Sequence, residues 1–389
     1  MNEISPLAME PTRAEHAATV GAYLEAGEER ARALANRGPV RFGADGKLHP
    51  DILDAYWERG FYVFEGVVGE AELAELRADA DMMIGRAPVR PDADVDAQGR
   101  PALGRDYARE PYTLVKPLSD PWGGTDKLNG RHPHRMTQPR PDEDAPDYVV
   151  FLMYGMCQAM PAALRVYGHP HLLAVAESIN GADFVPYNDA IFVKQAGVGG
   201  SVAWHQDGVT HWDSPDWDEG SHGFNFQVQL YPTTPANCLW VVPGTHKGGR
   251  IDIKRRVVEN GGDEKFPDAV PLICEPGDVT AVNRQMLHGS FANTSPDKRI
   301  SITMGFHRRR SVIGQKGKLS MGAGEVYDEQ RIFERSAVIQ VAIDARRQRF
   351  PEEASYRYRP FDGLEDEFRL NDETFERVIR DYNTKDLAI

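Results

Sequence analysis

Residues from two distant parts of the chain could together hold a metal ion. The run Trp204-His205-Gln206-Asp207 supplies a histidine and a carboxylate two positions apart, and His288 stands far downstream. Two histidines and one carboxylate form the facial ligand set that binds Fe(II) and leaves other coordination positions open for an organic acid and O₂. Arg299, which follows His288, has the planar guanidinium that suits capture of a carboxylate. These residue types point to an iron site that uses oxygen.

The elements that must position these residues are short β-strands. From residue 184 to 307, apolar or alternating runs are separated by Gly, Pro and Asn turns. Alternate residues of a strand point to the same side, so His205 and Asp207 can reach one metal while Gln206 faces away. The predicted strands of this region include 190–193, 224–230, 238–242, 278–282 and 300–306.

The pattern His-x-Asp is short, and the chain contains two further copies. His49-Pro50-Asp51 stands at a predicted helix start, where Asp51 would serve as a capping or first-turn acid. His211-Trp212-Asp213 lies in a polar, Pro-containing segment with the character of a loop, at the rim of the predicted pocket. Metal ligands need a rigid frame, so His205 and Asp207 are the better candidates.

The segments on either side of the β region are mainly helical. An all-β centre with helices before and after it predicts a sheet sandwich or barrel buttressed by helices. The predicted elements are one or two exposed helices in 10–37, a helix at 51–58, a strand at 61–64, an amphipathic helix at 71–84, helices in 148–180 with a second segment starting at Pro161, and a helix at 372–382.

Residues 86–147 are rich in Pro, Asp, Gly and Arg and show little periodicity. This segment is too long for an ordinary connection, so we expect a functional loop or a partly ordered insertion. Two interpretations stay open. The segment could fold over the site as a lid whose arginines recognise an acidic substrate, or it could be a solvated loop.

Composition limits the classes of partner. The chain of 389 residues has 45 Lys and Arg against 59 Asp and Glu, a net charge of −14, and no basic run, which argues against nucleic-acid binding and against an anionic membrane surface. Its three cysteines do not form a C-x-x-C pair, which favours a reducing compartment without disulfides. The N-terminus has no basic segment followed by an apolar one, and we expect a cytoplasmic protein with a small-molecule substrate. The sequence leaves the oligomeric state open.

Several motifs, in the same order along the chain, resemble those of the phytanoyl-CoA dioxygenase-like family of Fe(II)/2-oxoglutarate-dependent oxygenases. Residues 192–207 are similar to the family's first metal-binding motif, and residues 237–246 resemble the hairpin between its two ligand motifs. Residues 287–299 resemble the distal motif, and residues 58–66 its opening strand. The resemblance covers roughly residues 48–310 and is weakest at 86–180.

The resemblance implies a mainly β fold with flanking helices around a double-stranded β-helix, a jelly-roll or cupin-like core with the metal inside one end. The expected domains are an N-terminal helical extension at 1–47, the oxygenase domain at 48–310 and a C-terminal helical or irregular extension at 311–389. It also implies that His205, Asp207 and His288 ligate Fe(II), and that Arg299 binds the distal carboxylate of 2-oxoglutarate with help from Ser290. Further expected contacts are Gln227 and Lys194 for the cosubstrate and, among aromatic residues near the motif, Tyr187, Trp204, Trp212 and Phe224 for the substrate.

One position departs from the family near the expected cosubstrate. Gln227 stands where the family often has Trp. Strand alternation places Asn225, Gln227 and Gln229 on one face. That face is either a polar cavity wall or a solvent-facing sheet surface.

The reaction that the resemblance implies uses Fe(II), 2-oxoglutarate and O₂ to hydroxylate an unactivated C–H bond of a small-molecule metabolite, with release of succinate and CO₂. A carboxylate at Asp207 leaves no room for a chloride ligand, so hydroxylation is favoured over halogenation. Desaturation, cyclisation or epoxidation by the same iron chemistry remain alternatives. So does a jelly-roll metal-binding protein or isomerase that does not use 2-oxoglutarate, and Arg299 is the residue that argues against it.

Overall fold

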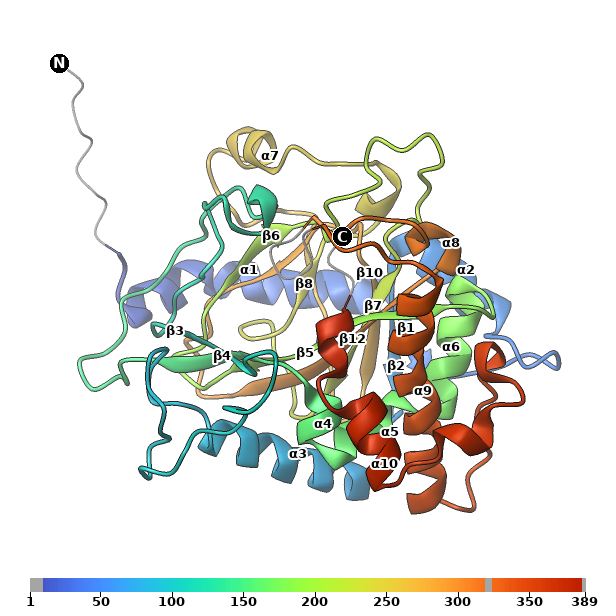
Figure 1. Ribbon diagram of the computed structural model, residues 1–389. Helices are drawn as coiled ribbons and strands as arrows, with labels where there is room; N and C mark the ends of the chain where they lie inside the picture. Colours follow the sequence, from blue (N-terminus) through green and yellow to red (C-terminus); the bar gives the residue numbers. More distant parts are fainter. Residues whose placement is uncertain (1–9, 319–323, 387–389) are drawn as a thin grey trace.

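The computed structural model describes residues 10–318 and 324–386, and two β-sheets form its centre (Figure 1). The larger sheet has the order β1-β2-β10-β7-β12-β5-β4-β3, and the smaller has the order β6-β11-β8-β9. The strand pairs of both sheets are antiparallel, except that β1 runs parallel to β2. The strands are β1 (Arg37–Pro39), β2 (Phe61–Glu65), β3 (Tyr112–Val115), β4 (Val149–Met153), β5 (Val185–Lys194), β6 (Val202–His205), β7 (Phe224–Gln229), β8 (Trp240–Val241), β9 (Val270–Pro271), β10 (Val279–Asn283), β11 (His288–Ser290) and β12 (Arg299–His307). This is the mainly β, double-stranded β-helix core that the sequence predicts.

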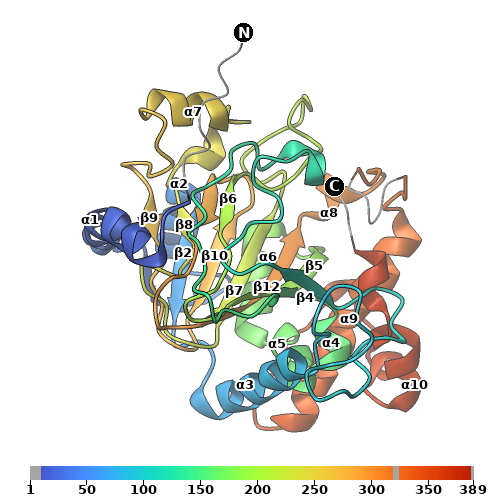
Figure 2. The same ribbon diagram turned by 90° about the vertical axis from the view of Figure 1, so that its left-hand side faces the viewer.

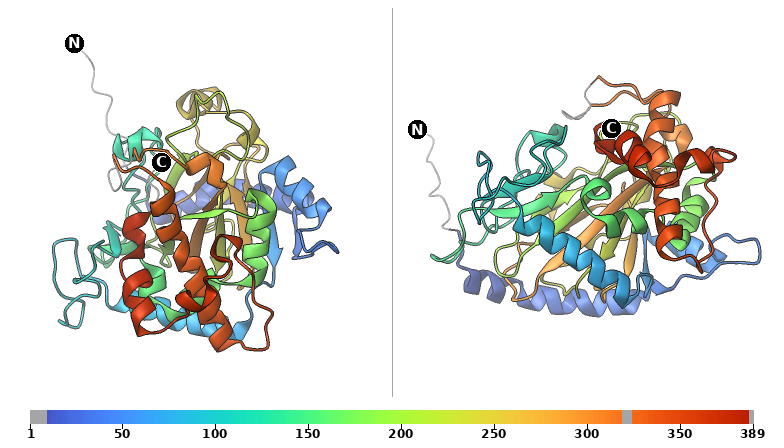
Figure 3. Two further views of the ribbon diagram at one scale, coloured as in Figure 1. Left: turned by 45° about the vertical axis from the view of Figure 1, so that its right-hand side comes forward. Right: turned by 60° about the horizontal axis from the view of Figure 1, so that its bottom comes forward.

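Most helices gather on one side of the larger sheet, where α5 packs against α3 and α9, and α9 against β5 (Figures 1 and 2). Helix α1 lies on the other side of the molecule, against β9 (Figure 3). The helices are α1 (Arg13–Leu34), α2 (Pro50–Arg59), α3 (Glu70–Gly85), α4 (Met156–Ala159), α5 (Pro161–Tyr167), α6 (Pro170–Asn180), α7 (Ile253–Glu259), α8 (Arg309–Val312), α9 (Glu329–Arg349) and α10 (Asp372–Thr374). Within the described ranges, no helix is long and apolar enough to cross a membrane.

Strand β7 separates the apolar core from the interior of the jelly roll. Phe224, Phe226 and Val228 point into the core between the larger sheet and the helices. Asn225 and Gln227, at the alternate positions, line a cavity on the opposite face. The polar face of this strand is therefore a cavity wall and not a solvent-facing surface.

The segment 148–180 differs from the prediction at its start. Val149–Met153 forms strand β4, paired with β3 and β5, and the first helix of the segment begins only at Met156. All five residues of β4 are buried, and a continuous apolar run shows no periodicity that separates a buried strand from a buried helix. The predicted start of a helix at Pro161 is confirmed by α5.

The C-terminal part also differs. The long helix α9 was not predicted, because its buried face carries charged residues such as Arg335, Asp344 and Arg346 that hide an apolar stripe. The predicted helix at 372–382 is only the short α10, followed by a wider turn at Phe375–Ile379 and a tight turn at Tyr382–Lys385.

Candidate metal centre and cosubstrate pocket

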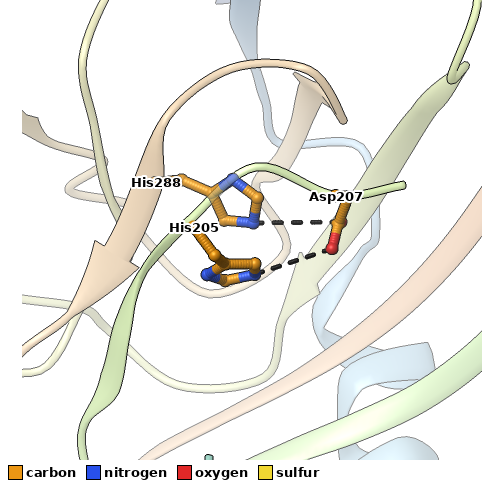
Figure 4. A group of neighbouring side chains, drawn as sticks. All are labelled: His205, Asp207 and His288. Atoms are coloured by element: carbon orange, nitrogen blue, oxygen red, sulfur yellow. Dashed lines mark ion pairs between the residues drawn. The ribbon is translucent and has the colours of Figure 1, made fainter. Parts of the chain in front are cut away.

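The two predicted histidine ligands meet because their strands are neighbours. Strand β6 ends at His205, β11 begins at His288, and the two residues lie directly opposite each other in the antiparallel pair. The His205 Nε2 atom lies 3.6 Å from Oδ1 of Asp207, and the His288 Nε2 atom lies 3.9 Å from its Oδ2 (Figure 4). One ligand atom from each residue lies within 4.8 Å of the other two. In the part of the chain that the structure describes, no other group of three such side chains has this geometry.

Both imidazoles are held with the same ring nitrogen facing inward. His205 Nδ1 is 2.8 Å from the carbonyl oxygen of Ala203, and His288 Nδ1 is 2.8 Å from that of Met286. A carbonyl accepts only from a protonated nitrogen, so Nδ1 carries the proton and Nε2 presents its lone pair. Burial, with the neighbouring His205, lowers the pKa of His288 to about 3, which keeps its ring neutral as metal binding requires. The donor set therefore fits Fe(II).

The carboxylate of Asp207 is ionised and held from several sides. Burial acts to raise its pKa, but Arg131, His205 and Arg284 outweigh burial and hold the pKa well below its usual range. Arg131 Nη1 lies 3.0 Å from Oδ1, and Asn225 Nδ2 donates to Oδ2 at 3.1 Å. Asp207 is thus ready to bind a cation. The intervening Gln206 points away from the metal ligands, as predicted, because its side chain bonds to the backbone around residues 249–251 and 285.

The three ligands open into one cavity of about 400 Å³, a size that accommodates small organic ligands. Strands β5, β7, β11 and β12 form part of its wall, and it contains polar and aromatic side chains from widely separated segments. Its polar lining includes Arg109, Arg131, Asn188, Asn225, Gln227, Arg284, Ser290, Arg299, Thr303, Asn383, Thr384 and Asp386.

Arg299 brings a buried positive charge to this cavity. Its side chain donates to Gln227 Oε1 at 2.8 Å and to the Asn237 carbonyl at 3.4 Å, while its Nε is buried without a partner. No described Asp or Glu pairs with the guanidinium, and burial lowers its pKa to about 10, which leaves it charged at neutral pH. A buried cation without a carboxylate is costly unless a ligand supplies the counter-charge. The arrangement fits the distal carboxylate of a small dicarboxylic acid.

Ser290 and Gln227 line the cavity as expected, but Lys194 does not. The Lys194 side chain is buried behind the wall, where Nζ donates to the carbonyl of Phe291. Burial, with the charge of Arg299, lowers the pKa of this amine well below its usual value. The expected contact between Lys194 and the cosubstrate is therefore corrected: Lys194 lies behind the cavity wall, opposite Arg299 in the β5–β12 strand pair.

The four aromatic residues expected at the substrate have different places. Tyr187 lines the cavity. Trp212 lines a neighbouring cavity with Gly208 and Arg250. Trp204 and Phe224 are fully buried in apolar clusters, Trp204 against Phe266 and Phe224 in the core under the helices, so they are not wall residues. Alternation along their strands turns both away from the metal side.

Several wall residues were missed because they come from segments without a pattern. Trp122, from the 86–147 segment, lines the cavity and packs against His132, which lies behind the wall. The rings are tilted against each other, with centroids 5.4 Å apart for Trp122 and His132 and 4.1 Å apart for His132 and the ligand His205. Both ring nitrogens of His132 are buried without a hydrogen-bond partner, and burial lowers its pKa well below the usual value. From the other end of the chain, Asn383 and Asp386 close a further side of the cavity. No motif in the sequence signals these contacts.

Comparison with known proteins agrees with the site. A family model described as phytanoyl-CoA dioxygenase (PhyH) matches residues 56–301. Phytanoyl-CoA dioxygenase 1 of Oryza sativa subsp. japonica is 32% identical over 121 residues, which cover 28% of this chain and 40% of that protein. Phytanoyl-CoA dioxygenase of Arabidopsis thaliana is 24% identical over 267 residues, which cover 66% of this chain and 88% of that protein.

Solved structures with a similar arrangement of elements include EctD from S. alaskensis with 2-oxoglutarate and 5-hydroxyectoine. That likeness has 17% identity and a TM-score of 0.46 and covers 70% of this chain and 80% of EctD. A second is the non-heme alpha ketoglutarate dependent epimerase SnoN from nogalamycin biosynthesis, with 16% identity and a TM-score of 0.40, covering 67% of this chain and 84% of SnoN.

Proposed function

Because this chain belongs to the phytanoyl-CoA dioxygenase family of Fe(II)/2-oxoglutarate-dependent oxygenases, we propose that it hydroxylates an unactivated C–H bond of a small-molecule metabolite. The products are the alcohol, succinate and CO₂, with 2-oxoglutarate and O₂ as cosubstrates. In this proposal His205, Asp207 and His288 ligate iron, and Arg299, Gln227 and Ser290 receive the cosubstrate.

The observation that carries the proposal is that Arg299, which pairs with no Asp or Glu among the described residues, lies in the same cavity as the three metal ligands. A jelly-roll metal site that works without a dicarboxylic acid has no use for a buried guanidinium that lacks a counter-ion. The cost of that charge is recovered only when an anion binds. Gln227 supports the same role, because its Oε1 accepts from Arg299 Nη2 and so orients the guanidinium.

The protein residues contribute binding, orientation and exclusion of water. Iron at this site would supply the oxidation of the C–H bond, with O₂ as oxidant and 2-oxoglutarate as reductant. Asp207 occupies the carboxylate position, which favours hydroxylation over transfer of a halide. The hydrogen bonds of His205 and His288 to backbone carbonyls fix both rings, so the ligand atoms stay in place before metal binds.

The test is formation of succinate from 2-oxoglutarate with Fe(II) and ascorbate, compared between the wild type and His205→Ala. We expect the wild type to form succinate and the rate in the variant to fall more than about 100-fold, because loss of one of the three ligands weakens Fe(II) binding. His49→Ala is a matched control, since His49 belongs to another His-x-Asp pair and caps helix α2. Equal turnover in wild type and His205→Ala, or none in the wild type with a wide range of small metabolites, would contradict the proposal.

A further inference from the structure

The cavity wall would carry more positive than negative charge once a metal is bound. The lining contains four arginines and only two aspartates, and it contains no lysine or glutamate. One of the two aspartates is Asp207, whose charge is committed to the metal. The other, Asp386, already pairs with Arg109 at 2.8 Å and with Arg335 at 2.9 Å.

Contacts in the structure, or the function proposed above, account for three of the four arginines. Arg109 pairs with Asp386 and lies over the ring of Tyr154 at 4.5 Å. Arg284 is fully buried, where it bonds to the His222 carbonyl and to His307 Nε2 and lies over the ring of Tyr187. Its Nε also lies 3.6 Å from Asp207 Oδ2, but these other contacts hold the guanidinium in place. Arg299 faces the expected cosubstrate. The fourth, Arg131, remains to be explained.

Arg131 has a metal ligand as its sole ion-pair partner among the described residues. Its Nη1 lies 3.0 Å from Asp207 Oδ1, and its Nε is buried without a hydrogen-bond partner. When Asp207 binds a divalent cation, its negative charge is shared, and Arg131 is left facing a cation at short range. Like charges in a buried site repel strongly, so an anion must balance Arg131 in the working enzyme.

The backbone that delivers Arg131 is held in an unusual conformation. Leu128 (φ 51°, ψ 40°) and Asn129 (φ 56°, ψ 34°) are left-handed, and Gly130 follows with φ 65°. L-residues other than Asn and Asp rarely adopt this region, and such conformations persist where the surroundings enforce them, often at ligand sites. The turn places two side chains in the cavity wall, Leu128 and Arg131.

One contact with the β core and one within the segment itself hold the chain around this turn. Asp120 accepts from the backbone N–H of Ala203, two residues before the ligand His205, at 2.7 Å. After the turn, the His132 carbonyl accepts from Gly124 N–H at 2.9 Å. Arg131 is therefore fixed relative to the metal ligands and is not a free surface side chain.

We propose that the substrate carries a carboxylate, and that Arg131 binds this group beside the metal ligands. The inference rests on the function proposed above and names the class of its substrate: a small molecule with one carboxylate and an apolar part. Leu128, Trp122, Leu152 and Phe192 supply apolar wall for that part. The guanidinium can hold a carboxylate through two parallel hydrogen bonds, which would fix the position of the C–H bond to be oxidised.

The experiment measures binding of matched acids and amides to the Fe(II)- and 2-oxoglutarate-loaded protein without oxygen. The probes are hexanoate, octanoate, phenylacetate and 3-phenylpropanoate, each compared with its primary amide by isothermal titration. In the wild type at least one acid should bind about 30-fold or more tightly than its amide, as loss of a buried charge pair predicts. In Arg131→Gln the acid and its amide should bind within about threefold of each other. Arg135→Gln, an exposed arginine of the same segment, should retain the wild-type preference.

Metal affinity separates this role from a structural one. If Arg131 only positioned Asp207, Arg131→Gln would weaken Fe(II) binding. If it binds substrate, removal of a cation beside the metal should leave Fe(II) affinity equal or higher. A weaker metal site in Arg131→Gln, an acid preference that survives in this variant, or a wild type that binds no acid better than its amide would each overturn the inference.

A failure of the proposed function can be told apart from a failure of the carboxylate inference by visible absorption. Fe(II) gains visible absorption when a 2-oxo acid chelates it, and the absence of this band in the wild type would refute the cosubstrate assignment. The comparison of acids and amides in the Fe(II)-loaded protein still decides the role of Arg131 in that case. A normal band without acid preference would refute only the carboxylate inference.

Discussion

Replacing Arg299 by glutamine removes the charge on which the cosubstrate assignment depends. The guanidinium is 2% exposed and has no carboxylate partner in the described chain, so its interaction with a bound carboxylate would be fully desolvated. Truncating one partner of a buried, hydrogen-bonded charge pair costs about 2–5 kcal/mol. With tenfold for each ~1.4 kcal/mol, the dissociation constant of 2-oxoglutarate should rise about 30-fold to several thousand-fold.

A double-mutant-type cycle, which varies both Arg299 and the ligand, isolates the interaction between the guanidinium and the distal carboxylate. 2-Oxopentanoate has the same chain length as 2-oxoglutarate and lacks only the distal carboxylate. Wild type and Arg299→Gln are titrated anaerobically with both acids in the presence of Fe(II), followed by visible absorption. The loss caused by the substitution should be large for 2-oxoglutarate and small for 2-oxopentanoate, with a coupling energy of about 2 kcal/mol or more.

Stability provides an internal check, because the cosubstrate-free protein carries an uncompensated buried charge. Arg299→Gln should therefore leave the free energy of unfolding unchanged or raise it by about 1 kcal/mol, while the stabilisation by added 2-oxoglutarate disappears. A coupling energy near zero would refute the reasoning, since Arg299 would then not face the distal carboxylate. Strong destabilisation of the cosubstrate-free protein would show that the guanidinium has a structural counter-charge.

Two further substitutions test a close backbone contact near the site and a buried histidine at the start of helix α6. Gly200→Ala would place a Cβ 2.1 Å from the Ser119 carbonyl oxygen. We expect the free energy of unfolding, measured in urea, to fall by about 1–3 kcal/mol, and substrate binding to weaken. The control Gly21→Ala, with open space around it, should stabilise the protein slightly. Burial, with Arg346 and His171, lowers the pKa of His169 to about 3. Below pH 6.5 this histidine is therefore protonated in the unfolded chain and stays neutral in the folded protein. The free energy of unfolding should then fall by about 2 kcal/mol from pH 6.5 to 5 because of this residue, and His169→Gln should remove that part of the slope. Unchanged stability in Gly200→Ala, or the same pH slope in His169→Gln, would count against these two accounts.

The metal ligands were predictable because local rules govern them. The spacing of His205 and Asp207 at a strand end turns both side chains to one side, and Gln206 faces away as that rule requires. The returning strand that begins at Arg299 was likewise expected and is β12, whereas His288 lies on a short separate strand, β11, in the smaller sheet and not on the strand that starts after Gly277. Alternation along β7 also showed which of its residues share a face, although it did not say whether that face is a cavity or a surface.

Residues outside regular patterns were not predictable. Trp122, Asn383 and Asp386 line the cavity from segments without periodicity, and their positions depend on contacts that exist only after folding. Helix α9 escaped notice for a related reason. Its buried charges are compensated by distant partners, such as Glu72 for Arg346 and Asp189 for Arg335, and those pairings exist only after folding.

The chain carries its chemistry in short motifs, because a metal site needs particular ligand types at spacings that backbone geometry sets locally. The wall that selects a substrate follows from contacts between segments far apart in sequence. Asp120 bonds to the strand of His205, Gly200 leaves room for the Ser119 carbonyl, and Arg131 thereby reaches Asp207. Such contacts depend on the whole fold, since loops without periodicity take their positions from the surfaces on which they pack.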